Sequence, residues 1–317
     1  MTSLSSLLDK ITRFAAGSPF PDTPHGLYEP CDYLLALGGK RLRPALLLMA
    51  YELFRDDVDA ALPAAWAVEL FHNFTLMHDD IMDAAPLRRG LPTVHEKWGV
   101  NTAILSGDAM LVKAYQLMGK RPEVLELFGR TALEVCEGQQ LDMDFERRED
   151  VRVGECLAML HRKTAVLLAC ALRTGAMVAG AGTKDQERLV AFGEHIGLAF
   201  QLRDDLLDAF GDPANTGKQR GGDLRAGKKT YLLIRGLERA AENRTGMLRE
   251  ELTKRPEQRD VERILTVLET LGVRDETEAL VIKHHRMAFA QLMAVDAPEE
   301  RKMPLIALAD RLVDRVV

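Results

Sequence analysis

The chain has 317 residues, of which 47% are hydrophobic, and its net charge at pH 7 is −6. This length and apolar content are ample for a large core, in one or two domains. The negative charge argues against bulk attraction to nucleic acid or acidic lipid, and an aromatic content of 6% provides no evident platform for stacking bases.

The residues to about Ala16 predict an amphipathic helix, without a basic segment before it or a long apolar run. We therefore expect no signal peptide, no membrane span and a cytoplasmic protein. The cysteines have neither metal-ligand nor paired spacing. They are expected to be small buried side chains in a reduced cytosol, at Cys31, Cys136, Cys156 and Cys170.

The first stretch with chemistry covers residues 38–44. Two glycines there expose backbone N–H groups, and three cations follow closely at Lys40, Arg41 and Arg43. Pro44 suits the first turn of the next helix. Glycines, a helix N-terminus and clustered cations together predict a phosphate site, with a basic surface cap as the alternative.

The next helix is apolar around most of its circumference, so we expect it to be largely buried. It ends in Asp79-Asp80-Ile81-Met82-Asp83, where Asp79 and Asp83 are four apart and share nearly one face. Like charges so placed repel, which predicts a hard divalent cation such as Mg²⁺. A solvated acidic face is the alternative. His72 is seven residues before Asp79 and points the same way, as a second polar ligand or as a core histidine.

The following loop, residues 84–93, places Arg88 and Arg89 just beyond the carboxylates. The forked donors of arginine suit phosphate oxygens, so this arrangement fits Mg²⁺ together with a polyanionic phosphate. Pairing of the arginines with the aspartates is the alternative.

A second acidic set, Asp204-Asp205-Leu206-Leu207-Asp208, repeats the pattern far downstream. Gln201 shares the face of its aspartates. Gly193 and Gly197 are four apart and would let another helix approach closely. Residues 211–230 are glycine-rich and basic, which predicts a mobile flap or, alternatively, a solvated loop.

Strand signals are absent, because the sequence has no sustained alternation and no Asn-Gly hairpin. Polar residues over 131–145 cannot be separated from an ordinary polar helix face. From Tyr231 onward the pattern is helical and shows no catalytic signature. No repeat or linker divides the chain, which favours a single all-α domain over residues 1–317.

These motifs, in this order and at this spacing, resemble those of the trans-isoprenyl diphosphate synthases, and the resemblance extends from about Tyr33 to Tyr231. It implies the isoprenoid-synthase helical bundle with a deep central cavity, usually as a homodimer. It also implies a Mg²⁺-dependent prenyltransferase that ionises an allylic diphosphate and joins it to isopentenyl diphosphate. The released diphosphate is the family's usual proton acceptor, so no general base is assigned.

The resemblance assigns roles by position in this sequence. Isopentenyl diphosphate would be bound by Lys40, Arg43, His72 and Arg89. The allylic diphosphate would be bound by Arg88, Lys163, Thr164, Gln201, Lys218 and Lys228. Mg²⁺ would be held by Asp79, Asp80, Asp83, Asp204, Asp205 and Asp208. Catalysis would depend most on Asp79, Asp83, Asp204, Lys163 and Lys228.

Product length depends on the helix before the first aspartate. In the family, a bulky residue five positions before it, here Phe74, suggests geranylgeranyl diphosphate as product, with farnesyl diphosphate as the runner-up. On an ideal helix, however, Thr75 and not Phe74 is about one turn below Asp79. Thr75 is therefore a second candidate for the product-length residue, and ordinary core packing is the alternative for Phe74. Gly221-Gly222-Asp223 resembles the longer-chain branch.

Three other classes are weighed against this interpretation. A terpene cyclase shares the fold and the first acidic motif, but it normally has Asn, Ser or Thr, and Glu in place of a second motif like Asp204–Asp208. A non-catalytic partner subunit should have lost ligands, yet every motif here is intact. A purely structural helical protein would need neither two acidic faces nor a basic glycine-rich flap.

Overall fold

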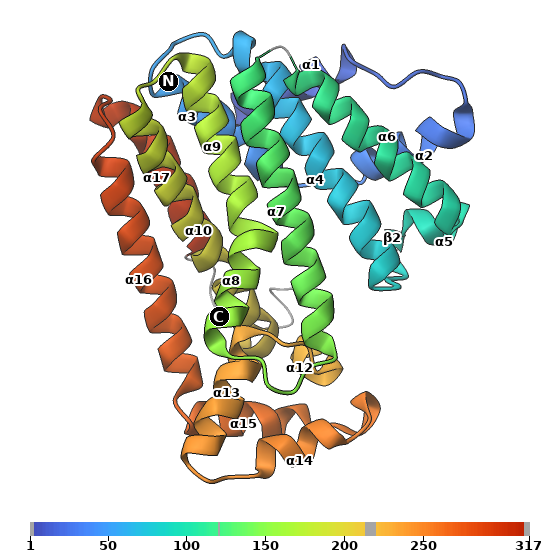
Figure 1. The fold of residues 1–317 in the computed structure, drawn as a ribbon, viewed down its shortest axis with the longest axis vertical. Helices are drawn as coiled ribbons and strands as arrows, with labels where there is room; N and C mark the ends of the chain where they lie inside the picture. Colours follow the sequence, from blue (N-terminus) through green and yellow to red (C-terminus); the bar gives the residue numbers. More distant parts are fainter. Residues whose placement is uncertain (1–2, 120, 213–219, 314–317) are drawn as a thin grey trace. The chain divides into compact units, whose positions relative to one another are not determined.

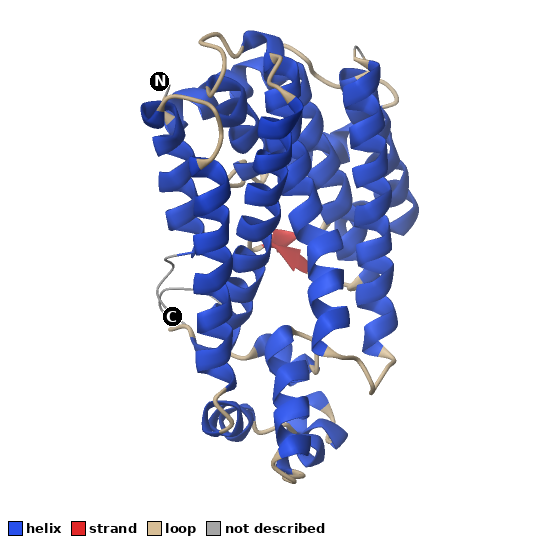
Figure 2. Ribbon diagram, turned by 60° about the vertical axis from the view of Figure 1, so that its left-hand side comes forward, coloured by secondary structure: helices blue, strands red, loops and turns tan. Residues whose placement is uncertain are grey.

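A computed structural model describes residues 3–119, 121–212 and 220–313, and helices make up most of this part of the chain (Figures 1 and 2). The first helices are α1 (Leu4–Ala16), α2 (His25–Ala36), α3 (Leu42–Glu52), η1 (Asp59–Ala61), α4 (Leu62–Met82), α5 (Val94–Trp98), α6 (Val100–Met118) and α7 (Pro122–Glu146). They are followed by α8 (Val153–Leu160), η2 (His161–Ala165), α9 (Val166–Ala179), α10 (Thr183–Phe210), α12 (Gly222–Ala226), α13 (Tyr231–Glu242), α14 (Met247–Thr253), η3 (Pro256–Gln258), α15 (Val261–Thr270), α16 (Val273–Met293) and α17 (Glu299–Val313). In the described residues, no helix combines the length and apolarity needed to cross a bilayer.

The chain forms two compact units. The first comprises Met1–Arg130, Cys170–Glu187 and Ala297–Pro304. The second comprises Thr131–Ala169, Arg188–Asp296 and Leu305–Val317. The single domain over residues 1–317 stays a prediction.

In the first unit, α3 and α4 form the centre of the core. Every residue of α3 from Pro44 to Glu52 is buried, as is the part of α4 from Ala64 to Phe71. Helices buried on all sides need apolar residues around their circumference, which the sequence provides. α9 approaches α3 at Gly175, where an added Cβ would lie 2.1 Å from the carbonyl oxygen of Leu47. Only glycine allows this approach.

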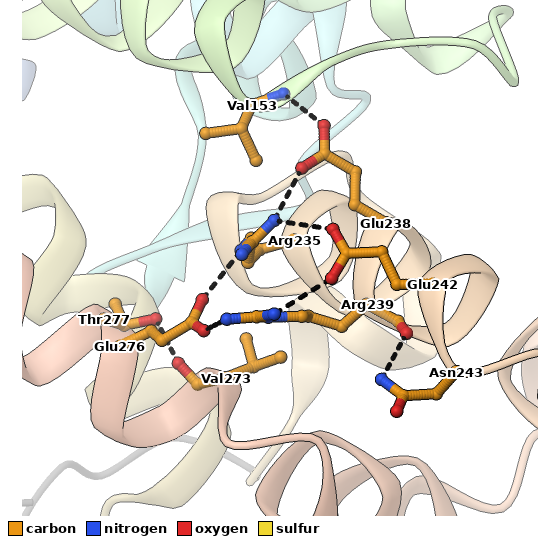
Figure 3. Close-up of polar contacts among 9 residues, drawn as sticks. All are labelled: Val153, Arg235, Glu238, Arg239, Glu242, Asn243, Val273, Glu276 and Thr277. Atoms are coloured by element: carbon orange, nitrogen blue, oxygen red, sulfur yellow. Dashed lines mark hydrogen bonds and ion pairs between the residues drawn. The ribbon is translucent and has the colours of Figure 1, made fainter.

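In the second unit, α13 packs against α8 and α16, and a polar network joins these three helices (Figure 3). Arg235 donates to Glu276 at 2.7 Å and to Glu238 at 3.0 Å, and Arg239 also pairs with Glu276. Glu238 accepts a hydrogen bond from the backbone N–H of Val153 at 3.1 Å, at the start of α8. The network therefore fixes the orientation of α13, which begins just after the basic loop.

One antiparallel hairpin departs from the prediction of no strands. β1 (Leu87–Arg88) pairs with β2 (Leu91–Pro92), and the turn residues Arg89 and Gly90 have φ values of 54° and 79°. Positive φ at both central residues is the geometry of a type I′ turn, which suits the twist of paired strands. Two-residue strands are too short to show alternation, and Arg89 stands where Asn or Asp is favoured, so the sequence carried no hairpin signal.

The cysteine prediction is right at three positions and wrong at one. Cys31, Cys156 and Cys170 are buried, whereas Cys136 is exposed. Cys136 lies on α7, within the polar stretch 131–145, where the sequence does not indicate which side of the helix faces inward.

Two histidines meet between α10 and α16 in the second unit. The Nδ1 atoms of His195 and His284 are 3.1 Å apart. Burial lowers the pKa of His284 to about 4, assisted by His195 and Lys283, and burial also lowers the pKa of His195. An unfolded histidine has a pKa of about 6.5, so the unfolded state binds more protons below that pH. The folded state should therefore lose stability as the pH falls from about 6.5 towards 4.

We expect the urea concentration at the midpoint of unfolding, followed by circular dichroism, to decrease as the pH is lowered from about 7.5 to about 5. His284→Gln should weaken this dependence, because a glutamine does not titrate. His25→Gln, at an exposed histidine, is the matched control and should leave it unchanged. An equally steep fall in the His284→Gln variant would contradict the prediction.

Candidate active site

The glycine-rich loop before α3 has an unusual backbone. Gly38, Gly39 and Arg41 have φ values of 77°, 153° and 44°. A left-handed conformation at a non-glycine residue such as Arg41 is strained, and such strain is concentrated at functional sites. α3 begins at Leu42, so Pro44 lies in its first turn as predicted.

Arg43 and His72 form the centre of the predicted isopentenyl diphosphate site. Arg43 Nη1 lies 3.0 Å from His72 Nε2. Burial and the neighbouring Arg43 hold the pKa of His72 well below its usual value, and burial lowers the pKa of Arg43 to about 10. His72 is therefore neutral at pH 7 and accepts the hydrogen bond, which aims the guanidinium of Arg43.

Arg89 completes this cluster from the hairpin turn. Its guanidinium lies against Gly39, where an added Cβ would be 2.8 Å from Arg89 Nη2. The charges of Arg88 and Arg89 also contribute to the lowered pKa of His72, so both arginines lie near it. The structure thus brings Gly39, Arg43, His72 and Arg89 together, with the exposed Lys40 next to Gly39.

Sequence reasoning missed an acid in this cluster. Glu69 is 6% exposed and accepts a hydrogen bond from Asn73 Nδ2 at 3.3 Å. Burial raises its pKa, against the opposing effect of Arg43. Within the described residues, its Oε2 and the Nε of Arg43 are buried without hydrogen-bond partners. No motif marked Glu69, because a single carboxylate in an apolar helix has no spacing signal.

The first acidic motif is divided between two environments at the end of α4. Asp80 is 3% exposed, and both of its carboxylate oxygens accept hydrogen bonds from Arg88, at 2.7 and 2.8 Å. This is the aspartate–arginine pairing that the sequence left open. Asp83 is exposed at the helix C-terminus, and its N–H donates to the Asp79 carbonyl at 2.8 Å. Asp80 therefore orients Arg88, and Asp79 and Asp83 are the better candidates for direct metal ligands.

Phe74 lies in a row of rings below the first motif. Its ring centroid is 4.7 Å from that of His78 and 5.6 Å from that of Phe71. His78 is fixed by α6, because it lies so close to Gly107 that an added Cβ would be 2.4 Å from Nε2. Thr75 donates its hydroxyl to the His72 carbonyl at 2.8 Å. Phe74 is thus held in place by its ring neighbours.

In the second unit, Gln201 connects the second acidic motif to Thr164. Gln201 accepts from the Thr164 hydroxyl at 3.3 Å and donates to Asp205 Oδ1 at 3.4 Å. Asp205 is 5% exposed, and burial raises its pKa to about 7, with Asp223 as a further cause. Asp208 Oδ2 accepts the backbone N–H of Asp223 at 3.0 Å.

Lys163 and Thr164 lie in η2, a π-helix that the sequence did not predict. Two glycines allow neighbouring helices to pack directly on it. An added Cβ at Gly138 of α7 would be 2.3 Å from the Lys163 backbone N, and one at Gly197 of α10 would be 2.5 Å from the Cα of Ala165. The predicted close approach at Gly197 is confirmed. Single-turn π-helices are frequent at functional sites, which agrees with the role predicted for this pair.

The Lys163 ammonium pairs with Asp142 Oδ2 at 2.5 Å, so Asp142 is another acid that sequence reasoning did not single out. Lys228 is exposed, and its backbone N–H donates to the Asp223 carbonyl at 2.9 Å. Lys218 lies outside the described residues.

The donor set fits a hard cation. All six predicted ligands offer carboxylate oxygens, and Asp205 Oδ2 is buried without a hydrogen-bond partner in the described residues. A cation bound nearby would give Asp205 Oδ2 the polar partner that it lacks. Among the described residues, no three His, Cys, Asp or Glu side chains are gathered closely enough to form a metal-binding group.

Comparison with known proteins identifies the family. The polyprenyl synthetase model matches residues 24–268. The geranylgeranyl diphosphate synthase of Methanosarcina mazei is 46% identical over 223 residues, which are 68% of this chain and 69% of that protein. A crystal structure of a geranylgeranyl pyrophosphate synthase has a TM-score of 0.94 and 43% identity, covering 100% of both chains. The enzyme of that name from Corynebacterium glutamicum, complexed with isoprenyl diphosphate and magnesium, has a TM-score of 0.82 and 32% identity, covering 99% of this chain and 96% of that one.

The chain therefore belongs to the polyprenyl synthetase family. It is an isoprenyl diphosphate synthase, a prenyltransferase with the helical-bundle fold of these relatives. The predictions of family, enzyme class and fold class are confirmed.

Proposed function

We propose that this prenyltransferase condenses isopentenyl diphosphate with an allylic diphosphate and releases geranylgeranyl diphosphate. The observation that carries the proposal is the cluster of Arg43, His72 and Arg89, in which His72 lies on α4, the helix that ends in the first aspartate motif. The buried Nε of Arg43, which has no partner in the described residues, suits a diphosphate oxygen. Relatives named for the same product support the product length.

The reaction begins when the bond between C1 of the allylic substrate and its diphosphate oxygen breaks, and the diphosphate keeps the electron pair. The alkene of isopentenyl diphosphate then attacks the allylic cation through C4. The proton lost from C2 passes to the released diphosphate, so no protein base is needed. Arg88, Lys163, Lys218 and Lys228 would supply fixed positive charge to that diphosphate.

We propose that the aspartate motifs hold Mg²⁺, through Asp79 and Asp83 in the first motif and Asp204, Asp205 and Asp208 in the second, with Asp80 in a supporting role. The ion would neutralise negative charge on the departing diphosphate. The relative solved with magnesium and isoprenyl diphosphate supports this choice. Within this chain, Asp80 would contribute through Arg88, which it holds by two hydrogen bonds.

We also propose a cytoplasmic homodimer. α6 carries apolar side chains that are exposed in the single chain, Ile104 at 40%, Leu105 at 60% and Val112 at 55%. Exposed apolar residues on one helix suit association with another copy.

The test is the chain length of the product made by the purified protein with Mg²⁺, isopentenyl diphosphate and each of three primers in turn: dimethylallyl, geranyl and farnesyl diphosphate. We expect geranylgeranyl diphosphate from all three. A farnesyl product, or a product longer than geranylgeranyl diphosphate, would overturn the product assignment alone. Absence of isopentenyl diphosphate consumption with every primer would overturn the reaction, and cyclic hydrocarbon formed without isopentenyl diphosphate would indicate a cyclase.

Phe74→Ala is expected to lengthen the product by at least one isoprene unit, because it removes a ring held against His78 and Phe71. Mass spectrometry of the products from farnesyl diphosphate measures this. Thr75→Ala tests the second candidate for the product-length residue, whose hydroxyl donates to the His72 carbonyl, and a longer product from that variant alone would assign the role to Thr75. An unchanged product from Phe74→Ala would leave Phe74 as ordinary core.

A further inference from the structure

α12, a helix of five residues in the second unit, connects the second aspartate motif to Lys228. Its N-terminal end is fixed by Asp208. The N–H of Gly221 donates to the Asp208 carbonyl at 2.6 Å, and the N–H of Asp223 donates to Asp208 Oδ2 at 3.0 Å. A helix this short has little stability of its own, so its position depends on contacts at both ends.

The C-terminal end of α12 stops in a left-handed turn at Gly227, with a φ of 77°. The N–H of Gly227 bonds to the Leu224 carbonyl at 3.1 Å, and the N–H of Lys228 bonds to the Asp223 carbonyl at 2.9 Å. This is the Schellman pattern, in which two of the terminal carbonyls are satisfied by the chain itself. The backbone of Lys228 is thus part of the helix cap.

The next carbonyl, that of Arg225, is satisfied by Arg259. Arg259 lies between η3 and α15 and donates from all three of its nitrogens to backbone carbonyls. Nη1 bonds to Arg225 at 2.7 Å, Nη2 to Leu252 at 3.1 Å and Nε to Lys254 at 3.1 Å. Because Leu252 and Lys254 lie at the end of α14, one planar guanidinium caps two helices at once.

Close packing reinforces these hydrogen bonds. The guanidinium of Arg259 lies against Gly227, where an added Cβ would be 2.5 Å from Nη1. At the other end of α12, Gly221 has a φ of 66°, and an added Cβ there would be 2.4 Å from Cγ1 of Val261. Gly227 therefore rests on Arg259, just before α15, and Gly221 rests on Val261, the first residue of α15.

We propose that Arg259 is a positioning residue for Lys228. By holding the C-terminal end of α12, it sets the backbone from which the Lys228 side chain reaches the allylic diphosphate. The inference rests on the proposed function, because the role of Lys228 belongs to it. In this role Arg259 acts through the backbone carbonyl that it binds, and it lies in the region where the sequence shows no catalytic signature.

Arg259→Ala is expected to lower kcat/KM for the allylic substrate by roughly 10- to 100-fold, the cost of a misplaced catalytic group. The KM for isopentenyl diphosphate should stay within twofold of the wild type. Arg259→Lys should behave similarly, because a lysine cannot reach three carbonyls with fixed geometry. Arg263→Ala is the matched control, since the Arg263 guanidinium pairs with the side chains of Glu250 and Glu251 of α14 instead of with the backbone of α12.

A double-mutant cycle separates positioning from general loss of structure. In a Lys228→Ala background, Arg259→Ala should cost less than threefold, because its effect passes through Lys228. Full additivity would overturn the inference. Gly227→Ala, which disturbs the same contact while keeping Arg259, should reproduce the allylic defect if Arg259→Ala does not fold. A wild type that consumes no isopentenyl diphosphate would overturn the proposed function, whereas unaltered allylic kinetics in Arg259→Ala and Gly227→Ala would overturn this inference alone.

Discussion

Asp79→Asn is expected to lose about 10³-fold of the wild-type turnover while keeping its fold, because loss of one group that stabilises the transition state costs about 10²–10³-fold. Asparagine has nearly the size of aspartate but carries no charge. Asp79 shares one face of α4 with the exposed Asp83, so the substitution removes half of the pair best placed to hold a cation.

Turnover of isopentenyl diphosphate at saturating primer and Mg²⁺ measures the effect. Asp32→Asn, at an exposed aspartate of α2, is the matched control and should stay within twofold of the wild type. Raising the Mg²⁺ concentration should restore part of the activity of the Asp79 variant, and a chelator should abolish the activity of the wild type. Retention of a tenth or more of the turnover by Asp79→Asn would remove the metal role of this residue.

The second motif should behave in the same way. If both motifs act on one diphosphate, Asp204→Asn and Asp79→Asn are not additive, because residues that act as a unit lose most of their effect with the first substitution. We expect the turnover of the double variant to be within tenfold of the turnover of the less active single variant. If the fold-loss of turnover in the double variant instead equals the two single fold-losses multiplied together, the two motifs have independent roles.

The sequence predicted the members of the isopentenyl diphosphate cluster but not how they meet. Spacing on a helix placed His72 and the aspartates, because helical periodicity is a local property. Arg89 reaches Gly39 only because the loop after α4 closes into a type I′ hairpin, and an Arg-Gly turn between two-residue strands has no sequence signal. Contacts made through such turns depend on the folded chain.

The residues that sequence reasoning missed share a different cause. Glu69, Asp142 and Arg259 each act through a partner distant in sequence: Arg43, Lys163 and the backbone of α12. A single charged residue within a helix or loop has no spacing that separates it from an ordinary surface charge. The π-helix at Lys163 is likewise set by the close approach of Gly138 and Gly197, a tertiary contact that local preference does not encode.

Arg88→Ala is expected to lower the free energy of unfolding of the first unit by about 3 kcal/mol, the cost of leaving a buried charge without its partner. The Asp80 side chain is 4% exposed, and the Arg88 side chain is 23% exposed. The loss of unfolding free energy should therefore differ between Arg88→Ala and Asp80→Ala. Asp80→Ala leaves a guanidinium that can still reach water, so it should cost less than Arg88→Ala, and the double variant should recover part of the loss.

Tryptophan fluorescence can follow this transition selectively, because both tryptophans of the chain, Trp66 and Trp98, belong to the first unit. Urea unfolding of the two single variants and the double variant gives the order of stability. Arg130→Ala, which removes an arginine 64% exposed in an ion pair with Glu126, is the control and should change the midpoint little. Equal losses in Arg88→Ala and Asp80→Ala would mean that water reaches the carboxylate, and Asp80 would then be accessible as a direct metal ligand instead of serving to orient Arg88.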